Sequence, residues 1–128
     1  MKKALCICSV LFISLFYGGY SLAKDVIKVG LITPLTGDVK TFGESTKNAF
    51  NIALEEYAKT GKYTIQPIIA DDRNDPTEGA NTALKLITQD KVVAIIGPLT
   101  SKVAIPVSEI ANSNKTPMIS GTATNPKV

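Results

Sequence analysis

The side chains best suited to bind a small polar molecule are hydroxyls in two loops. Thr100 and Ser101 follow one apolar run of the sequence, and Thr122 and Thr124 follow the next. Ser101 stands where a strand gives way to a helix, so its hydroxyl and the first helical N–H groups could bind an anion such as a carboxylate. Serine is also a common N-cap residue, and Ser101 could serve only as the cap of its own helix.

Thr122 and Thr124 alternate around Ala123. An extended loop would place both hydroxyls on one side, where they could reach a ligand, although a solvated Ser/Thr loop has the same composition. Phe42 lies in another loop of the same rim. Its ring could cover an apolar ligand side chain or simply staple the first helix.

An acidic cluster of Asp71, Asp72 and Asp75 raises the question of a metal site. The EF-hand loop needs acidic or amide residues at alternate positions and a glycine at the sixth. Counted from Asp71, the third residue is Arg73 and the sixth is Pro76. Capping and solvation therefore explain the cluster better than metal binding.

Composition removes most catalytic chemistry. The sequence has no histidine, its two cysteines are Cys6 and Cys8, and the motifs G-x-S-x-G, G-x-G-x-x-G and G-x-x-x-x-G-K-[ST] are missing. The 14 basic residues include Lys2 and Lys3, so the chain after residue 23 nearly balances its 11 acidic residues. We predict no enzymatic activity, no cofactor, no metal and no nucleic-acid partner.

The first 23 residues resemble a secretory signal peptide. Lys2 and Lys3 precede an almost unbroken apolar run at 4–16, and Ser21 and Ala23 provide small residues for cleavage. An uncleaved membrane anchor is the alternative, but the run is shorter than the ~20 residues that a spanning helix needs. We predict export to the periplasm, a signal peptide at 1–23 and a mature chain from residue 24.

The remaining sequence alternates strand and helix patterns. We expect strands at 26–32, 63–70, 92–96 and 116–120, and helices at 44–59, from Pro76 to near Asp90, and after Ser101. Asp75 as N-cap, Pro76 at N1 and Glu78 at N3 form a strong helix start. Pro67 predicts an edge strand, and Pro106 predicts a kink or a delayed start of the last helix.

Apolar stripes should face a sheet. The first helix carries Phe50, Ala53, Leu54 and Tyr57 at helical spacing, and the second carries Ala80, Ala83, Leu84 and Ile87. The continuous run 92–96 predicts a strand covered on both faces. The order β-α-β-α-β-α-β predicts an α/β fold with a parallel, doubly wound open sheet, and ligands bind such sheets at the carboxyl ends of the strands.

The segment 27–37, IKVGLITPLTG, with Phe42-Gly43 after it, resembles the opening of type I periplasmic binding proteins of the branched-chain amino-acid class. The resemblance continues through Asp71-Asp72, Asp75-Pro76, 93–97, Thr100-Ser101 and 117–126. It implies a two-lobed protein that closes on an amino acid and presents it to the membrane permease of an ABC importer. The resemblance also implies that Ser101 and Thr124 hold the ligand carboxylate, that the carbonyl of Thr122 meets the ammonium, and that Phe42 flanks the side chain.

Members of that family are much longer than this chain. We therefore expect residues 24–128 to be the amino-terminal part of the first lobe, without the second lobe, and the full-length protein to be a monomer. A periplasmic sensor of the same fold, binding an amide or a small organic acid, is the alternative function. An enzyme on this fold is a third possibility, which the composition disfavours.

Overall fold

The computed structural model of the chain describes residues 25–128. The predicted signal peptide at 1–23 lies outside the described residues, as do Cys6 and Cys8. The elements are β1 (Val26–Thr33), α2 (Lys40–Thr60), β2 (Thr64–Asp71), α3 (Pro76–Lys85) with a π-helical turn (Leu86–Asp90), β3 (Ala94–Ile96), α4 (Ser101–Ser113) and β4 (Met118–Ile119).

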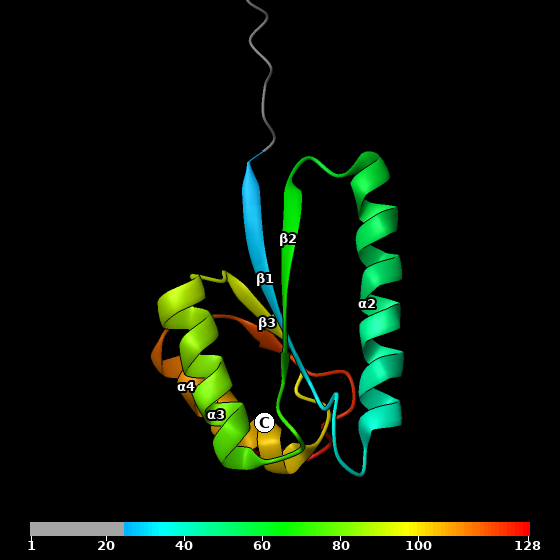
Figure 1. Cartoon of the computed structure of the whole chain (residues 1–128). Coiled ribbons are helices and arrows are strands. Elements are labelled where there is room, and N and C mark those ends of the chain that lie inside the picture. Colours follow the sequence, from blue (N-terminus) through cyan, green and yellow to red (C-terminus); the bar gives the residue numbers. More distant parts are fainter. Residues whose placement is uncertain (1–24) are drawn as a thin grey trace, which may run out of the picture.

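The four strands form one parallel sheet in the order β2-β1-β3-β4. The chain moves from β1 to β2 on one side and then crosses back to β3 and β4 on the other. Right-handed crossovers therefore place α2 on one face of the sheet and α3 and α4 on the opposite face, as Figure 1 shows. This arrangement confirms the predicted parallel, doubly wound α/β fold.

The core lies between the sheet and the pair α3–α4. Ile32, from β1, and Ile95, from β3, are both inaccessible to solvent and pack against helical side chains. The buried residues of this cluster are Ile32, Ala83, Leu86, Val92, Ile95, Val103 and Val107. β2 is an edge strand, as Pro67 predicted, because β1 alone pairs with it in the part of the chain that the structure describes.

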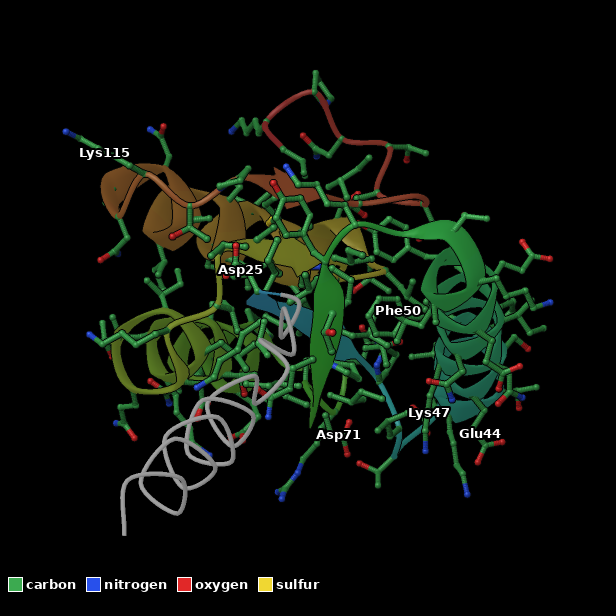
Figure 2. The ribbon with its side chains drawn as sticks, turned by 90° about the horizontal axis from the view of Figure 1, so that it is seen from above. Asp25, Glu44, Lys47, Phe50, Asp71 and Lys115 are labelled. Atoms are coloured by element: carbon green, nitrogen blue, oxygen red, sulfur yellow. The ribbon has the colours of Figure 1, made fainter. Side chains whose placement is uncertain are left out.

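The first helix differs from its prediction. α2 begins at Lys40 rather than Glu44, without a side-chain cap, and the Lys40 N–H donates to the carbonyl of Gly37 at 3.2 Å. Phe50 lies between the helix and the strands, as Figure 2 shows, but Ala53 and Tyr57 are exposed. The predicted stripe is therefore only partly covered, and the main contacts of α2 with other elements are those with β1 and β2.

Two other elements also differ from their predictions. The buried face of the second helix is formed by Gly79, Ala83 and Leu86, while Leu84 is largely exposed, so the predicted stripe is rotated. β3 begins only at Ala94, and Val93 is 55% exposed, so this run is not covered on both faces. The cap, Pro and Glu positions of α3 are as predicted.

α4 runs without a break from Ser101 to Ser113 and contains Pro106. The predicted delayed start is wrong, because α4 already begins at Ser101, five residues before Pro106. In residues 25–128, every helix is too short or too polar to cross a membrane.

Candidate functional site

The chain reverses its direction across the sheet between β1 and β3, so a crevice opens beyond the carboxyl ends of these two strands. Gly97, the first residue after β3, has φ +93°, and a Cβ there would overlap the carbonyl oxygen of Ile32. Only glycine allows this close approach of the two strand ends. The loops after β1 and β3 are thereby brought side by side.

A pocket of about 410 Å³ lies between these loops and the start of α2. Its lining residues are Val39, Phe42, Ser45, Thr46, Leu99, Thr100 and Thr122. Three predicted site residues, Phe42, Thr100 and Thr122, therefore meet at one cavity. Phe42 lies in the first turn of α2 rather than in a loop, and its ring is 69% exposed.

Ser101 is the first residue of α4, and the residue at the N-cap position is Thr100. The interpretation of Ser101 as only the cap of its helix is therefore wrong. The Ser101 hydroxyl oxygen instead accepts hydrogen bonds from the backbone N–H groups of Thr124 and Asn125, each at 3.2 Å. The two loops that carry the predicted carboxylate ligands are joined at this oxygen.

These two bonds determine what Ser101 can still do. A hydroxyl has two acceptor lone pairs and one proton to donate, and both lone pairs are engaged. Among residues 25–128 no acceptor is recorded for the proton. Thr100 makes no side-chain capping bond at the start of α4, where only its carbonyl accepts, from the N–H groups of Val103 and Ala104. The Ser101 O–H and the positive end of α4 can together bind a carboxylate.

The loop after β4 is fastened to the loop after β3 by two further hydroxyls. Thr122 donates to the carbonyl of Leu99 at 2.6 Å, and Ser120 donates to that of Pro98 at 2.5 Å. The Thr122 side chain is thus engaged with the protein. Thr124 contributes its backbone N–H to Ser101, and neither Thr124 nor Ser101 lines the pocket itself.

The acidic cluster has a structural role that solvation alone does not describe. Asp75 caps α3 by accepting the Glu78 N–H at 2.8 Å, as predicted. Asp72, in contrast, is only 1% exposed and accepts the Asn74 N–H at 2.8 Å. The part of the chain that the structure describes contains no group of three or more acidic residues placed to hold a metal ion.

The two neighbouring carboxyls are perturbed in opposite directions. Burial raises the pKa of Asp72 above its ordinary value, against the hydrogen bond from Asn74. Burial alone would also raise the pKa of Asp71, but hydrogen bonds, first of all from the Thr36 hydroxyl, outweigh it and hold that pKa below its ordinary value. Asp71 is therefore ionised in the fold down to acidic pH.

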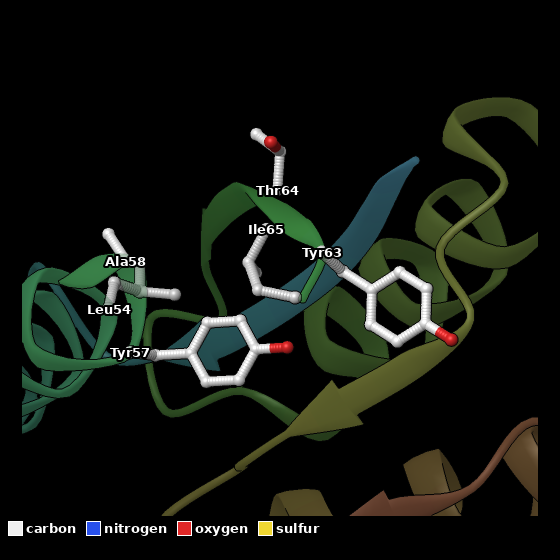
Figure 3. Close-up of a pocket in the computed structure, with 6 residues that line it drawn as sticks. All are labelled: Leu54, Tyr57, Ala58, Tyr63, Thr64 and Ile65. Atoms are coloured by element: carbon white, nitrogen blue, oxygen red, sulfur yellow. The ribbon is translucent and has the colours of Figure 1, made fainter. Parts of the chain in front are cut away.

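A second, smaller cavity of about 110 Å³ lies at the other end of the sheet. Figure 3 shows the rings of Tyr57 and Tyr63 on either side of Ile65 at this site. It adjoins the amino end of β2, far from the strand ends where α/β sheets bind ligands. The larger pocket is therefore the better candidate.

Sequence reasoning missed several residues of the larger pocket. Ser45 and Thr46 lie one turn after Phe42 on the same helix, and the early start of α2 is what brings them to the rim. Leu99 lies in a loop that the sequence did select. Asn74, which lies outside the pocket, was also not selected, although its side-chain oxygen accepts a hydrogen bond from the Thr100 hydroxyl at 2.7 Å.

The family model that describes periplasmic binding proteins matches residues 26–128. A Leu/Ile/Val-binding protein from Rhizobium johnstonii is 39% identical over 108 residues, which cover 82% of this chain and 29% of the relative. The chain therefore spans less than a third of the length of that relative.

Solved structures give the same picture. A branched-chain amino acid transporter substrate-binding protein from Streptococcus pneumoniae, in complex with isoleucine, superposes with a TM-score of 0.76 at 27% identity. The match covers 80% of this chain and 30% of that one. A solute-binding protein of an ABC transporter from Rhodopseudomonas palustris, in complex with 3,4-dihydroxybenzoic acid, has a TM-score of 0.73 at 32% identity, covering 78% of this chain and 28% of that one.

Proposed function

The chain belongs to the periplasmic binding protein family, and we propose that it holds the carboxylate of an amino acid in the solute-binding component of an ABC importer. The amino acid is branched-chain or similar, since a Leu/Ile/Val-binding relative and an isoleucine complex are among the similar proteins. The protein binds solute and does not transform it.

The observation that carries this proposal is the environment of Ser101. Its hydroxyl oxygen accepts two backbone N–H groups, from Thr124 and Asn125, which leaves its own proton for an external acceptor. The proton lies at the start of α4, which has no side-chain cap. A ligand carboxylate there would gain a charge-assisted hydrogen bond and the favourable field of the helix end.

The other site residues take complementary roles. Thr124 joins Ser101 in holding the carboxylate, and the carbonyl of Thr122 accepts from the ligand ammonium. The neighbouring pocket of about 410 Å³, with Phe42 on its rim and Thr100 on its wall, receives the ligand side chain. Its size is in the range of pockets that hold small molecules.

A second candidate ligand class is a small organic acid. The Rhodopseudomonas palustris protein in complex with 3,4-dihydroxybenzoic acid has the same fold, and a carboxylate is common to both ligand classes. Such a ligand would use the site at Ser101 in the same way but would not need an ammonium partner. A sensor protein of this fold could bind either class.

The remaining features of the proposal concern the whole protein. Residues 1–23 act as a cleaved signal peptide, and residues 24–128 form the first part of one lobe. A second lobe closes on the ligand, and the closed, monomeric protein docks on a membrane permease. No nucleic acid, metal or cofactor takes part.

A ligand screen tests the proposal. The full-length gene product is mixed with single amino acids, amides and small aromatic acids, and its melting temperature is measured. We expect a rise with one subset of apolar amino acids, because ligand binding to the folded state stabilises it. No rise with any amino acid would contradict the proposed ligand class, and a rise only with aromatic acids would favour the second candidate.

Ser101→Ala tests the site. Loss of a hydrogen bond to a charged ligand should weaken binding about 10- to 100-fold by isothermal titration calorimetry. The matched control is Ser113→Ala on the same helix, where the hydroxyl donates only to the carbonyl of Glu109. Equal affinities of the Ser101→Ala variant and the unmodified protein would place the carboxylate elsewhere.

A further inference from the structure

The β2–α3 loop, defined here as residues 71–75 and so including the last residue of β2, contributes no side chain to the larger pocket among the described residues. It nevertheless touches both loops that form the crevice. It makes these contacts through two side chains. Asp71 is hydrogen-bonded to the loop after β1, and Asn74 is hydrogen-bonded to the loop after β3. Figure 2 shows Asp71 at the end of the edge strand β2.

On the β1 side, one carboxylate makes three hydrogen bonds. Asp71 Oδ1 accepts the N–H groups of Leu35 at 2.8 Å and Arg73 at 2.9 Å, and Oδ2 accepts the Thr36 hydroxyl at 2.6 Å. Leu35 and Thr36 belong to the segment that leads into α2, where Phe42 lies. Bonds to an ionised carboxylate are stronger than neutral ones, so Asp71 holds this segment firmly.

On the β3 side, one amide holds the start of α4. Asn74 Oδ1 accepts a hydrogen bond from the Thr100 hydroxyl, with 2.7 Å between the two oxygens. Thr100 is the N-cap residue of α4 but makes no capping bond with its side chain. Its hydroxyl is turned to Asn74 instead. Asn74 thus fixes the residue immediately before Ser101.

The loop itself is held in a specific shape. Arg73 and Asn74 both have left-handed backbone conformations, with φ of 50° and 55°. Each is supported from two residues before, since Asp71 accepts the Arg73 N–H and Asp72 accepts the Asn74 N–H. Asp72 is buried, and the Asp72 N–H donates to the carbonyl of Thr33 at 3.4 Å. Such a loop can act as a rigid spacer.

We propose that the loop of residues 71–75 is a positioning element of the ligand site, with Asp71 setting the place of the loop after β1 and Asn74 that of the loop after β3. The expected effect of this loop on ligand affinity rests on the proposed function. Its structural part, the fastening of each loop, is independent of which ligand binds. Neither Asp71 nor Asn74 contacts the ligand.

Hydrogen–deuterium exchange of the unliganded full-length protein tests the structural part. Asn74→Ala should speed exchange in residues 97–103 and leave residues 34–39 unchanged, while Asp71→Ala should speed exchange in 34–39. Asp75→Ala is the matched control, because its carboxylate bonds only to the Glu78 N–H of its own helix. It should lower the melting temperature without affecting exchange in either loop. Unchanged exchange in 97–103 of Asn74→Ala would overturn the inference.

Titration with L-leucine tests the functional part. Asn74→Ala should raise the Kd about tenfold at a temperature where the protein is fully folded. Asn74→Asp, which keeps an acceptor oxygen, should restore most of the affinity. In a protein that already carries Thr100→Val, Asn74→Ala should cause no further rise in the Kd, since Asn74 acts through Thr100.

The outcomes separate this inference from the proposed function. If the unmodified protein does not bind leucine while the exchange results hold, the ligand class is wrong and the positioning loop stands. The positioning role is wrong, and the proposed function stands, if the unmodified protein binds leucine but either of two results is found. Asn74→Ala raises the Kd by the same factor in the unmodified and the Thr100→Val proteins, or it leaves the Kd unchanged.

Discussion

At the scale of single residues, two adjacent carboxyls show how the environment decides behaviour. Asp71 accepts hydrogen bonds from Leu35, Thr36 and Arg73, and its pKa lies below the ordinary value. The Asp72 side chain is buried and, within residues 25–128, accepts a hydrogen bond from the Asn74 N–H alone. Its pKa lies above the ordinary value. The two residues should therefore make opposite contributions to the pH dependence of stability.

We predict that Asp72→Asn stabilises the protein at neutral pH. A raised pKa means that the folded state holds the proton more tightly than the unfolded chain does. This stabilisation is complete below pH 3.8, the ordinary value, and is lost as pH rises through the raised pKa. Melting temperatures from pH 3 to 8 should show an advantage of Asp72→Asn at pH 7 that disappears in acid.

Asp71→Asn is the matched comparison with the opposite sign. Its lowered pKa stabilises the fold above pH 3.8, and that stabilisation is lost as pH falls through the lowered pKa. The variant should melt below the unmodified protein at pH 7, and the difference should narrow in acid. If Asp71→Asn and Asp72→Asn changed the melting temperature at pH 7 in the same direction, the assigned environments would be contradicted.

The sequence predicted local roles better than long-range ones at this scale. Asp75 was identified as a cap because N-capping depends on residues three apart in the chain. The burial of Asp72 and the bond from Thr100 to Asn74 join segments that only the folded sheet brings together. Ser101 was selected correctly as lying at a helix start, but its bonds to the loop after β4 were beyond a reading of local spacing.

At the scale of elements, the start of α2 illustrates a conflict between local propensity and tertiary packing. We predicted a loop through Gly43 and a helix from Glu44, and glycine indeed disfavours helix interiors. In the structure Gly43 is buried in the first turns of α2, and a Cβ there would overlap the carbonyl oxygen of Pro34. The glycine allows the helix to pack directly against the loop after β1.

Gly43→Ala should therefore destabilise the protein. Helix propensity favours alanine by ~1 kcal/mol, but forced overlap with backbone costs about 1–3 kcal/mol or more. We expect a net loss of up to ~2 kcal/mol in the free energy of unfolding, measured by urea denaturation. Gly121→Ala is the control, because nothing lies within 4 Å of its added methyl group. A more stable Gly43→Ala variant would show that the loop yields freely.

Element types were predictable and their covered faces were not. Periodicity located the strands and helices, since a period of two or 3.6 is a local property. The stripes on α2 and α3 were wrong in part because the face that a helix buries depends on its neighbours. Val93 and Tyr57 are 55% and 39% exposed, although the sequence pattern placed both on covered faces.

At the scale of the whole molecule, apolar surface is unevenly covered. α3 and α4 bury one face of the sheet, whereas on the other face α2 packs over β1 and β2. On the uncovered part Ile119, in β4, is 67% exposed. The sheet topology itself was predictable, because short connections and right-handed crossovers leave few alternatives for a βα repeat.

The last prediction concerns residues 24–128 as an isolated polypeptide. Among the described residues the larger pocket is lined by the start of α2, Val39 before it, and the loops after β3 and β4, and it is open to solvent at Phe42, which is 69% exposed. Tight sites enclose most of a ligand, and proteins that bind between domains reach this by closing a hinge. We expect the isolated polypeptide to bind leucine far more weakly than about 1 μM, a value that corresponds to roughly −8 kcal/mol.

Calorimetric titration of both proteins with leucine measures the difference, and circular dichroism verifies that the short polypeptide is folded. Exposed Ile119 and Val93 should also make it bind an apolar fluorescent dye more strongly than the full-length protein does. Ile119→Lys should lower that dye signal without changing the helical spectrum. Micromolar binding by the folded short polypeptide would mean that the loops around Ser101 and Phe42 enclose enough of the ligand alone, and that lobe closure adds little to affinity.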